Sequence, residues 1–351
     1  MKRILGERKK KEVYLELLRI IAIIMVIFNH TDGFFLYYSN TNNLLTWWFS
    51  FTGSVLCRCN VPLFIMITGA LLLDKEESVP DLYKKRIARI GIVLILFSLF
   101  YYCLNILRNG EASFSLTDFL KGVLSGSIQE SFWYLYLYLG LLAVLPLFRR
   151  MAVNAGNDEI KYILLLQVVL ETGMKAFSFL TGAEVNSNLY VLNRYVFYLL
   201  AGYYLSRRIN MEKGSKAWIT GAIAISTLSL AGTFVIVKLG WHRDGMYSQE
   251  ILDLFTPVLS MGIFGAIRWL CLRFRITGRR EKIICEIGGC VFGIYLMEQL
   301  ARIQLLPLYL YLTEHTFGVI ACSSYVICSF CLALLYTELL KRIPFLSRLL
   351  T

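Results

Sequence analysis

Two ionisable residues interrupt the first apolar segment of this sequence. Residues 17–34 read LLRIIAIIMVIFNHTDGF, with Arg19 near one end and His30 near the other. A charge at the centre of a membrane span costs about 2.5–3.5 kcal/mol, so such residues usually face a bundle interior or a water-filled cavity. A helix turns about 100° and rises about 1.5 Å per residue, so both side chains share one face about 16 Å apart. This face could hold an anion at one end and carry out acid–base or nucleophilic chemistry at the other.

Two more ionisable residues are expected at the level of His30. Counted from the cytoplasmic ends of their predicted spans, His30 lies at about 24 Å, Arg58 at about 22 Å and Glu298 at about 21 Å. In such a group the imidazole could act as a general base or a nucleophile, Glu298 could orient it, and Arg58 could stabilise developing negative charge. A structural alternative remains, because Glu298 can also pair with Arg302 within its own helix.

Other charged residues in the apolar segments have ordinary structural explanations. Glu171 and Lys175 are four residues apart and are expected to pair along one helix. Arg194 and Asp253 lie within about a turn of predicted span ends, so their side chains are expected to extend toward water.

The segment CRCNVPLFIMITGALLL carries a proline beside Arg58. Pro62 removes a backbone donor and is expected to kink the helix, while Asn60 and Gly69 supply polarity and close approach near the kink. A broken helix that carries an arginine is more typical of a cavity wall than of a scaffold.

A basic turn begins the third predicted span. In DLYKKRIARI, the positions of Lys85, Arg86 and Arg89 place Lys85 and Arg89 on one face of a helix. Basic side chains at a membrane surface suit phosphate binding, arginine in a bidentate manner. Contact with anionic membrane lipid, or the usual topology of membrane proteins, explains the same residues.

The composition predicts an all-α polytopic membrane protein. Of its 351 residues 57% are hydrophobic and 17% are charged, where a soluble domain carries about 25% charge. We expect a single domain over residues 1–351, because no repeat or long linker interrupts it, and read the basic start as an uncleaved first span. About ten segments are long and apolar enough to cross a membrane, approximately 14–37, 44–73, 87–107, 132–149, 160–181, 189–206, 217–239, 249–270, 284–305 and 317–340.

The basic residues predict the orientation. Most of the 36 Lys and Arg residues fall at the two ends of the chain and in alternate loops, while the opposite loops hold only Arg108, Lys121, Lys238 and Arg243. Both termini are therefore expected in the cytoplasm, which requires an even number of spans. Topology thus explains the net charge of +12, and nucleic acid is not expected as a partner. Nine cysteines, an odd number with no histidine at metal-ligand spacing, favour neither a disulfide framework nor a metal site.

Together these segments resemble the acyltransferase-3 family of integral membrane acyltransferases. RIIAIIMVIFNH matches the family's Arg–ten residues–His signature, and VPLFIMITGALLL resembles its proline-bearing segment. KRIARI resembles its Arg-Arg-x-x-Arg element, and FWYLYLYLGLLAVLPLF and FGIYLMEQL resemble two later segments. There are two departures: Ser131 and Glu298 stand where many relatives have histidine.

The resemblance implies an activity and a location. The family transfers an acyl group, commonly acetyl, from cytoplasmic acyl-CoA to a hydroxyl of a surface polysaccharide or its lipid-linked precursor, at the bacterial plasma membrane. His30 would be the catalytic histidine, and the CoA phosphates would contact Arg19, Lys85, Arg86 and Arg89. A pantetheine arm, at about 1.2–1.5 Å per bond, would cover the about 16 Å from Arg19 to His30.

Two other functions use the same residues. A transporter or flippase for a glycolipid or small solute would also need a broken helix and buried charges, although residues 1–175 and 176–351 show no internal repeat. A membrane partner without catalytic activity would keep the fold, and the altered positions Ser131 and Glu298 are compatible with it.

Overall fold

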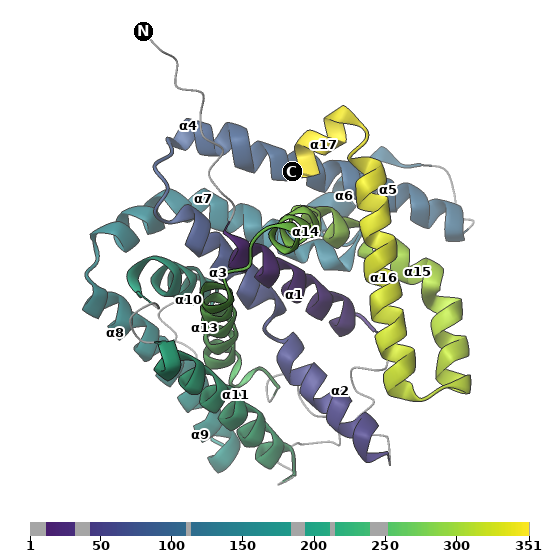
Figure 1. Cartoon of the computed structure of the whole chain (residues 1–351). Coiled ribbons are helices and arrows are strands. Elements are labelled where there is room, and N and C mark those ends of the chain that lie inside the picture. The colour runs from purple at the N-terminus through teal and green to yellow at the C-terminus, as the bar shows by residue number, and fades with distance from the viewer. Residues whose placement is uncertain are drawn as a thin grey trace. The chain divides into compact units, whose positions relative to one another are not determined.

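A computed structural model describes residues 12–31, 43–109, 114–183, 194–210, 215–238 and 252–350. All regular secondary structure in these ranges is helical (Figure 1), which confirms the all-α prediction. Contacts group the chain into two compact units. Unit 1 comprises Met1–Ala70 and Asn157–Leu339, and unit 2 comprises Leu71–Gly156 and Leu340–Thr351.

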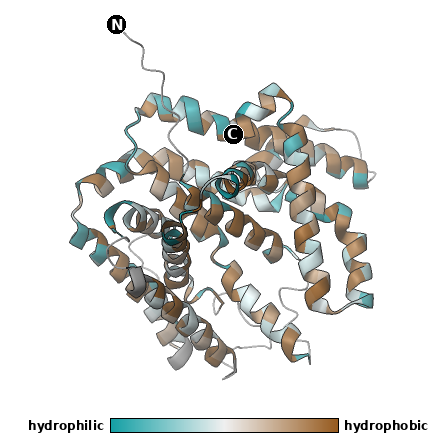
Figure 2. Cartoon of the chain, in the orientation of Figure 1, coloured by the Kyte–Doolittle hydropathy of each residue, from teal (hydrophilic) through white to brown (hydrophobic). Residues whose placement is uncertain are grey.

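Unit 1 holds most of the helices. Hydrophobic residues cover most of their length, and hydrophilic residues gather near helix ends and in polar segments such as α14 (Figure 2). The helices that begin in this unit are α1 (Val13–Asn29), α2 (Leu44–Cys57), α3 (Asn60–Leu72), α8 (Asn157–Val168), η4 (Val169–Gly173), α9 (Met174–Thr181), α10 (Arg194–Tyr203), η6 (Tyr204–Arg208), α11 (Ser215–Lys238), α13 (Thr256–Phe274), α14 (Arg279–Gly288), α15 (Val291–His315) and α16 (Gly318–Leu340).

Unit 2 is built on two long apolar helices joined by shorter ones. Tyr101 of the first packs edge-on against Phe132, just before the second, with ring centroids 5.6 Å apart. Its helices are α4 (Val79–Leu82), η2 (Tyr83–Ile87), α5 (Ala88–Asn109), α6 (Leu116–Ser125), η3 (Glu130–Phe132), α7 (Trp133–Asn154) and α17 (Pro344–Leu350).

Six helices in the described part of the chain are long and apolar enough to cross a membrane, or up to seven if α14 and α15, which meet at 60°, form one span. The chain is a multi-pass membrane protein. The number of about ten spans and the cytoplasmic side of both termini stay predictions. The first predicted span corresponds to a 17-residue helix, with residues 32–37 outside the described ranges. The sixth begins at Arg194 in the described part.

The second predicted span is broken, as expected, but the break precedes the proline. Helix α2 ends at Cys57 and α3 begins at Asn60. Pro62 is therefore in the first turn of α3, where a backbone N–H has no partner within the helix and its loss costs little. The interruption places Arg58 between two helices.

Two glycines bring α3 and α10 into backbone contact. A Cβ atom on Gly69 would collide with the carbonyl of Leu199, and one on Gly202 would collide with the carbonyl of Met66. Small residues allow membrane helices to approach closely and gain dispersion contacts. The close approach expected at Gly69 is confirmed, and it holds the later part of α3 against α10.

Candidate active site

Helix α1 ends at the histidine. His30 is its C-cap, and its backbone N–H donates to Ile27 O at 3.2 Å and Val26 O at 3.1 Å. Helix α1 contacts α2, α13, α14 and α15 (Figure 1), and Leu18, Ala22 and Ile23 are buried. The imidazole thus stands at the end of a helix held on several sides.

Close packing at two glycines positions the end of α14 and the start of α15. A Cβ on Gly288, at the end of α14, would collide with the Glu16 side chain of α1. A Cβ on Gly293, in the first turn of α15, would collide with Thr337 of α16. Because these two positions admit only glycine without rearrangement, the end of α14 can lie against α1 and the start of α15 against α16.

His30 and Glu298 form a direct pair. The imidazole Nδ1 lies 3.1 Å from Glu298 Oε1, and the Glu298 side chain is 0% exposed while that of His30 is 27% exposed. A buried carboxylate that accepts the Nδ1–H selects the tautomer with the lone pair on Nε2. The ring is therefore oriented with its basic nitrogen away from the carboxylate, the arrangement that a general base or a nucleophile requires.

Arg302 joins both members of this pair. Its Nε donates to Glu298 Oε2 at 2.6 Å, and its Nη1 donates to the carbonyl oxygen of His30 at 2.6 Å. The hydroxyl of Tyr325 on α16 donates to the carbonyl of Arg302 at 3.0 Å. The local pair expected between Glu298 and Arg302 is present. The hydrogen bond from Arg302 to the His30 carbonyl was not expected, because i,i+3 and i,i+4 spacing predicts contacts only within one helix.

Arg19 lies at the other end of α1. Its Nη1 donates to Glu16 Oε1 at 2.8 Å, and its side chain is part-exposed. This is the local pair that i,i+3 spacing favours. A role for Arg19 in holding a donor phosphate stays a prediction.

Arg58 lies at the break between α2 and α3, with its Nε 3.7 Å from Asp253 Oδ1. Helix α2, which ends just before Arg58, contacts α1, the helix that ends at His30. The expectation that Arg58 serves as an oxyanion donor stays a prediction.

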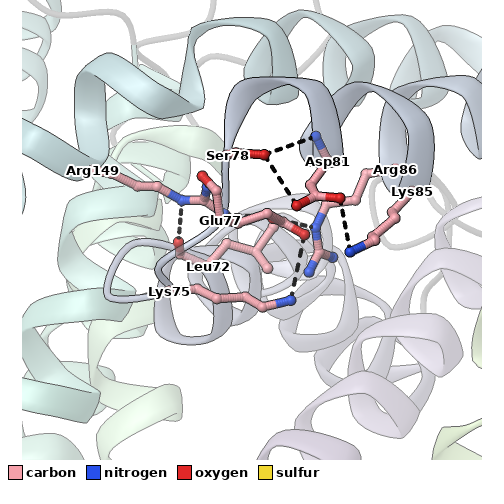
Figure 3. Close-up of polar contacts among 8 residues, drawn as sticks. All are labelled: Leu72, Lys75, Glu77, Ser78, Asp81, Lys85, Arg86 and Arg149. Atoms are coloured by element: carbon pink, nitrogen blue, oxygen red, sulfur yellow. Dashed lines mark hydrogen bonds and ion pairs between the residues drawn. The ribbon is translucent and has the colours of Figure 1, made fainter.

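The basic turn of unit 2 is ordered around two carboxylates (Figure 3). Lys85 Nζ lies 3.0 Å from Asp81 Oδ1, and both side chains are well exposed. Arg86 Nε donates to Glu77 Oε2 at 3.0 Å. Lys85 and Arg86 therefore each have a carboxylate partner, which holds the side chain in place before any ligand binds.

Arg149 and Glu77 are two residues of this region that sequence reasoning missed. The Arg149 Nη2 donates to Glu77 Oε2 at 3.0 Å, and its Nε donates to the carbonyl of Leu72 at 2.8 Å (Figure 3). Arg149 thus bonds the last residue of α3 and ties the following turn to α7. The available signal was a group of acidic residues, DKEESVPD at 74–81, directly before the basic turn.

Several cations keep Glu77 ionised. Burial would raise the pKa of this carboxyl, but hydrogen bonds from Arg149 and Arg86 and the charge of Lys75 lower it to about 2. Lys75 Nζ lies 3.5 Å from Glu77 Oε1. The network is therefore intact at any pH near neutrality.

Arg89 differs from its neighbours in the basic turn. It is half-buried on α5, and its Nε makes no hydrogen bond within the described ranges. A guanidinium donor that is buried and unsatisfied costs free energy until a partner binds. Arg89 is thus the residue of the turn best prepared to accept an anion.

A known protein family matches nearly the whole chain. The acyltransferase-3 family model, described as an acyltransferase domain, matches residues 12–337. The match includes His30, Glu298, Arg58 and the basic turn. No curated protein and no solved structure matches the chain.

Proposed function

The chain belongs to the acyltransferase-3 family, and on this premise we propose that it moves an acyl group, most simply acetyl, from acyl-CoA to a hydroxyl of a cell-surface polysaccharide or its lipid-linked precursor. The observation that carries the proposal is the His30–Glu298 pair at 3.1 Å, with the carboxylate fully buried. The proposed setting is the plasma membrane of a bacterium.

In the proposed reaction His30 is a general base. Its Nε2 takes the proton of the acceptor hydroxyl as the oxygen attacks the thioester carbonyl. The C–S bond breaks, and the imidazolium returns the proton to the leaving thiolate of CoA. Glu298 holds the ring and stabilises the imidazolium. Arg58 would donate to the oxyanion that develops on the carbonyl oxygen.

The basic turn is proposed to hold the donor. Lys85 and Arg86 lie in η2, and Arg89 follows in the first turn of α5. Arginine binds phosphate in a bidentate manner and lysine as a point charge, so the turn suits the several phosphates of CoA. Arg19 is proposed as a further phosphate contact from α1.

Mass spectrometry of envelope polysaccharide tests the function. Strains carrying the wild-type chain, His30→Ala, the control His315→Ala or no chain should be compared at equal protein levels. His315 is the exposed last residue of α15, so its replacement should leave ester content unchanged. Loss of ester in the His30 variant alone is expected, and full esterification in that variant would reject the mechanism.

Reconstitution separates this proposal from transport. Purified chain in vesicles should consume acyl-CoA in proportion to the ester formed. Movement of a glycolipid across the vesicle membrane without any use of acyl-CoA would support a transporter or flippase. A chain that neither transfers nor transports would support a silent partner.

A further inference from the structure

A second group of charged side chains lies in unit 1, outside the His30–Glu298 pair. We call it the Arg194 cluster, and it consists of five residues from the α2–α3 break, η4, α9, the start of α10 and the segment just before α13, namely Arg58, Glu171, Lys175, Arg194 and Asp253. From the sequence, Glu171 and Lys175 were expected to form a local pair, Arg194 and Asp253 to extend toward water, and Arg58 to lie near His30. The structure brings them together.

Shared carboxylates connect the cluster. Glu171 Oε1 lies 3.6 Å from Lys175 Nζ and 3.4 Å from Arg194 Nε. Asp253 lies 3.9 Å from Arg194 Nη1 through one carboxylate oxygen and 3.7 Å from Arg58 Nε through the other. Arg194 therefore stands between two carboxylates and is the link between the two halves of the cluster.

The contacts of the cluster are long. A charge-assisted N–H···O bond is usually about 2.7–2.9 Å, and all four ion pairs here exceed it. Ionic partners at this separation gain Coulomb energy without a well-formed hydrogen bond. The lone pairs of the carboxylates and the guanidinium N–H groups can thus exchange partners at small cost.

The cluster is partly open. The Arg194 side chain is 42% exposed, whereas that of Glu171 is 6% exposed. Glu171 lies in η4, a single π-helical turn between α8 and α9, and such turns occur frequently at functional sites. A buried carboxylate therefore holds a guanidinium that is itself partly accessible.

The cluster is connected to the candidate active site through Arg58. Arg58 is the C-cap of α2, and α2 contacts α1, which ends at His30. The predicted orientation places the ends of the helices that carry Arg194 and Asp253 on the side opposite the cytoplasm. This is the side from which the proposed acceptor would approach.

We propose that the Arg194 cluster binds an anionic group of the acceptor, either a sugar carboxylate or a carrier-lipid phosphate. The inference rests on the proposed function and adds the chemical class of its acceptor. Arg194 donates to the anion with support from Lys175, and Glu171 holds these two cations in position. Asp253 occupies part of the same guanidinium until the anion takes its place.

Charge favours an anion over a cation as the ligand. The five residues of the cluster comprise three cations and two carboxylates, and the most exposed side chain among them is an arginine. A purely structural ion-pair network would give stability without any preference among acceptors. Selectivity between acidic and neutral ligands therefore distinguishes a binding site from a network.

Two matched pairs of probes test the inference on the full chain in detergent. Methyl glucuronide is compared with methyl glucoside, and polyprenyl phosphate with polyprenol, by equilibrium binding. We expect the acidic member of at least one pair to bind about tenfold or more tightly than its neutral partner, which is about 1.4 kcal/mol. A preference confined to the glucuronide identifies a sugar carboxylate, and one confined to the lipid identifies a phosphate. No acidic preference in either pair overturns the inference.

Substitutions locate the preference in the cluster. Arg194→Gln should abolish it, and Arg194→Lys, which keeps the charge but not the bidentate geometry, should reduce it in part. Asp253→Asn removes the competing carboxylate and should tighten the acidic probe. Lys161→Gln is the control, because Lys161 forms an exposed pair with Asp158 on α8.

The outcomes separate this inference from the proposed function. If Arg194→Gln folds with an unchanged melting temperature and keeps the acidic preference, the cluster is not the site, even if ester formation still depends on His30. If His30→Ala retains full ester formation, the proposed reaction fails, whatever the acidic preference is. If Arg194→Gln does not fold, the Arg194→Lys and Asp253→Asn results decide.

Discussion

Unit 1 holds two groups of ionisable side chains in different ways. Around His30 the polar contacts are 2.6–3.1 Å long, and Glu298 is fully buried. In the Arg194 cluster the ion pairs are 3.4–3.9 Å long, and Arg194 is 42% exposed. Short, buried contacts fix a reacting group in its productive geometry. Longer contacts at a partly open site leave room for a ligand to replace a protein partner.

Replacing Glu298 tests the short-contact group and should have the largest effect. Glu298→Gln keeps the shape but no longer selects the Nδ1–H tautomer or stabilises the imidazolium, so we expect kcat to fall by about 10²–10⁴. The measurement is steady-state acyl transfer by reconstituted protein. KM for acyl-CoA should stay within about twofold, since Glu298 is not proposed to contact the donor.

The control for this prediction is Glu286→Gln, an exposed residue of α14. Its kcat should equal that of the wild type. If Glu298→Gln also had the kcat of the wild type, the short contacts around His30 would serve structure alone. The difference between the two groups would then have no bearing on catalysis.

The kinetics of an Arg58 variant show whether Arg58 acts with His30 or with the Arg194 cluster. If it stabilises the oxyanion, Arg58→Gln should lower kcat by about 10²–10³ with little change in acceptor KM. A rise in acceptor KM at constant kcat would assign Arg58 to the Arg194 cluster alone. Separate determination of kcat and KM with an acidic acceptor provides the measurement.

The basic turn offers a third arrangement, with carboxylates at 3.0 Å from exposed or half-exposed cations. Replacing Arg86 and Arg89 together by glutamine should raise KM for acyl-CoA by about 10–100-fold, because each charge-assisted hydrogen bond contributes about 1.5–3 kcal/mol and water replaces part of it. Acceptor KM should not change. Donor titration with Lys84→Gln as a control measures the effect, and an unchanged donor KM would reject the phosphate assignment.

Glu77 should produce the smallest effect near neutral pH and a larger one in acid. Its pKa is lowered from 4.5 to about 2 by Arg149 and Arg86, so its ion pairs stabilise the fold fully above pH 4.5. That contribution is lost as the pH falls from about 4.5 toward 2. The wild type should therefore lose melting temperature more steeply than Glu77→Gln over this interval, and the two slopes should agree between pH 6 and 8. Equal slopes in acid would contradict the assignment.

The sequence predicted those features that depend on helix geometry. Constant rise per residue placed His30 and Glu298 at one level, and the structure shows them in contact, although their catalytic role stays a prediction. The break near Arg58 was also predicted, but assigned to Pro62. A proline in the first turn of a helix does not break it, so the position of the helix start mattered more than the presence of the proline.

Contacts between distant helices were not predictable in the same way. Glu171 meets Arg194 across two helices, and Arg302 donates to the backbone of His30. Apolar periodicity and charge bias define spans and orientation, but they do not say which spans are neighbours. Which helices are neighbours depends on the fit between their surfaces, as where Gly69 lies against the backbone of Leu199. The residue pattern along a single helix does not reveal that fit.

The two members of the His30–Glu298 pair are separated by 268 positions in the chain. During synthesis α1 is made first, and α15 is among the last helices to leave the ribosome. The basic turn that is proposed to hold acyl-CoA is made early as well. A growing chain therefore contains the residues proposed to bind the donor long before His30 has its carboxylate partner. In the proposed mechanism, a thioester bound at that stage would not react early, because Glu298 has not yet been made.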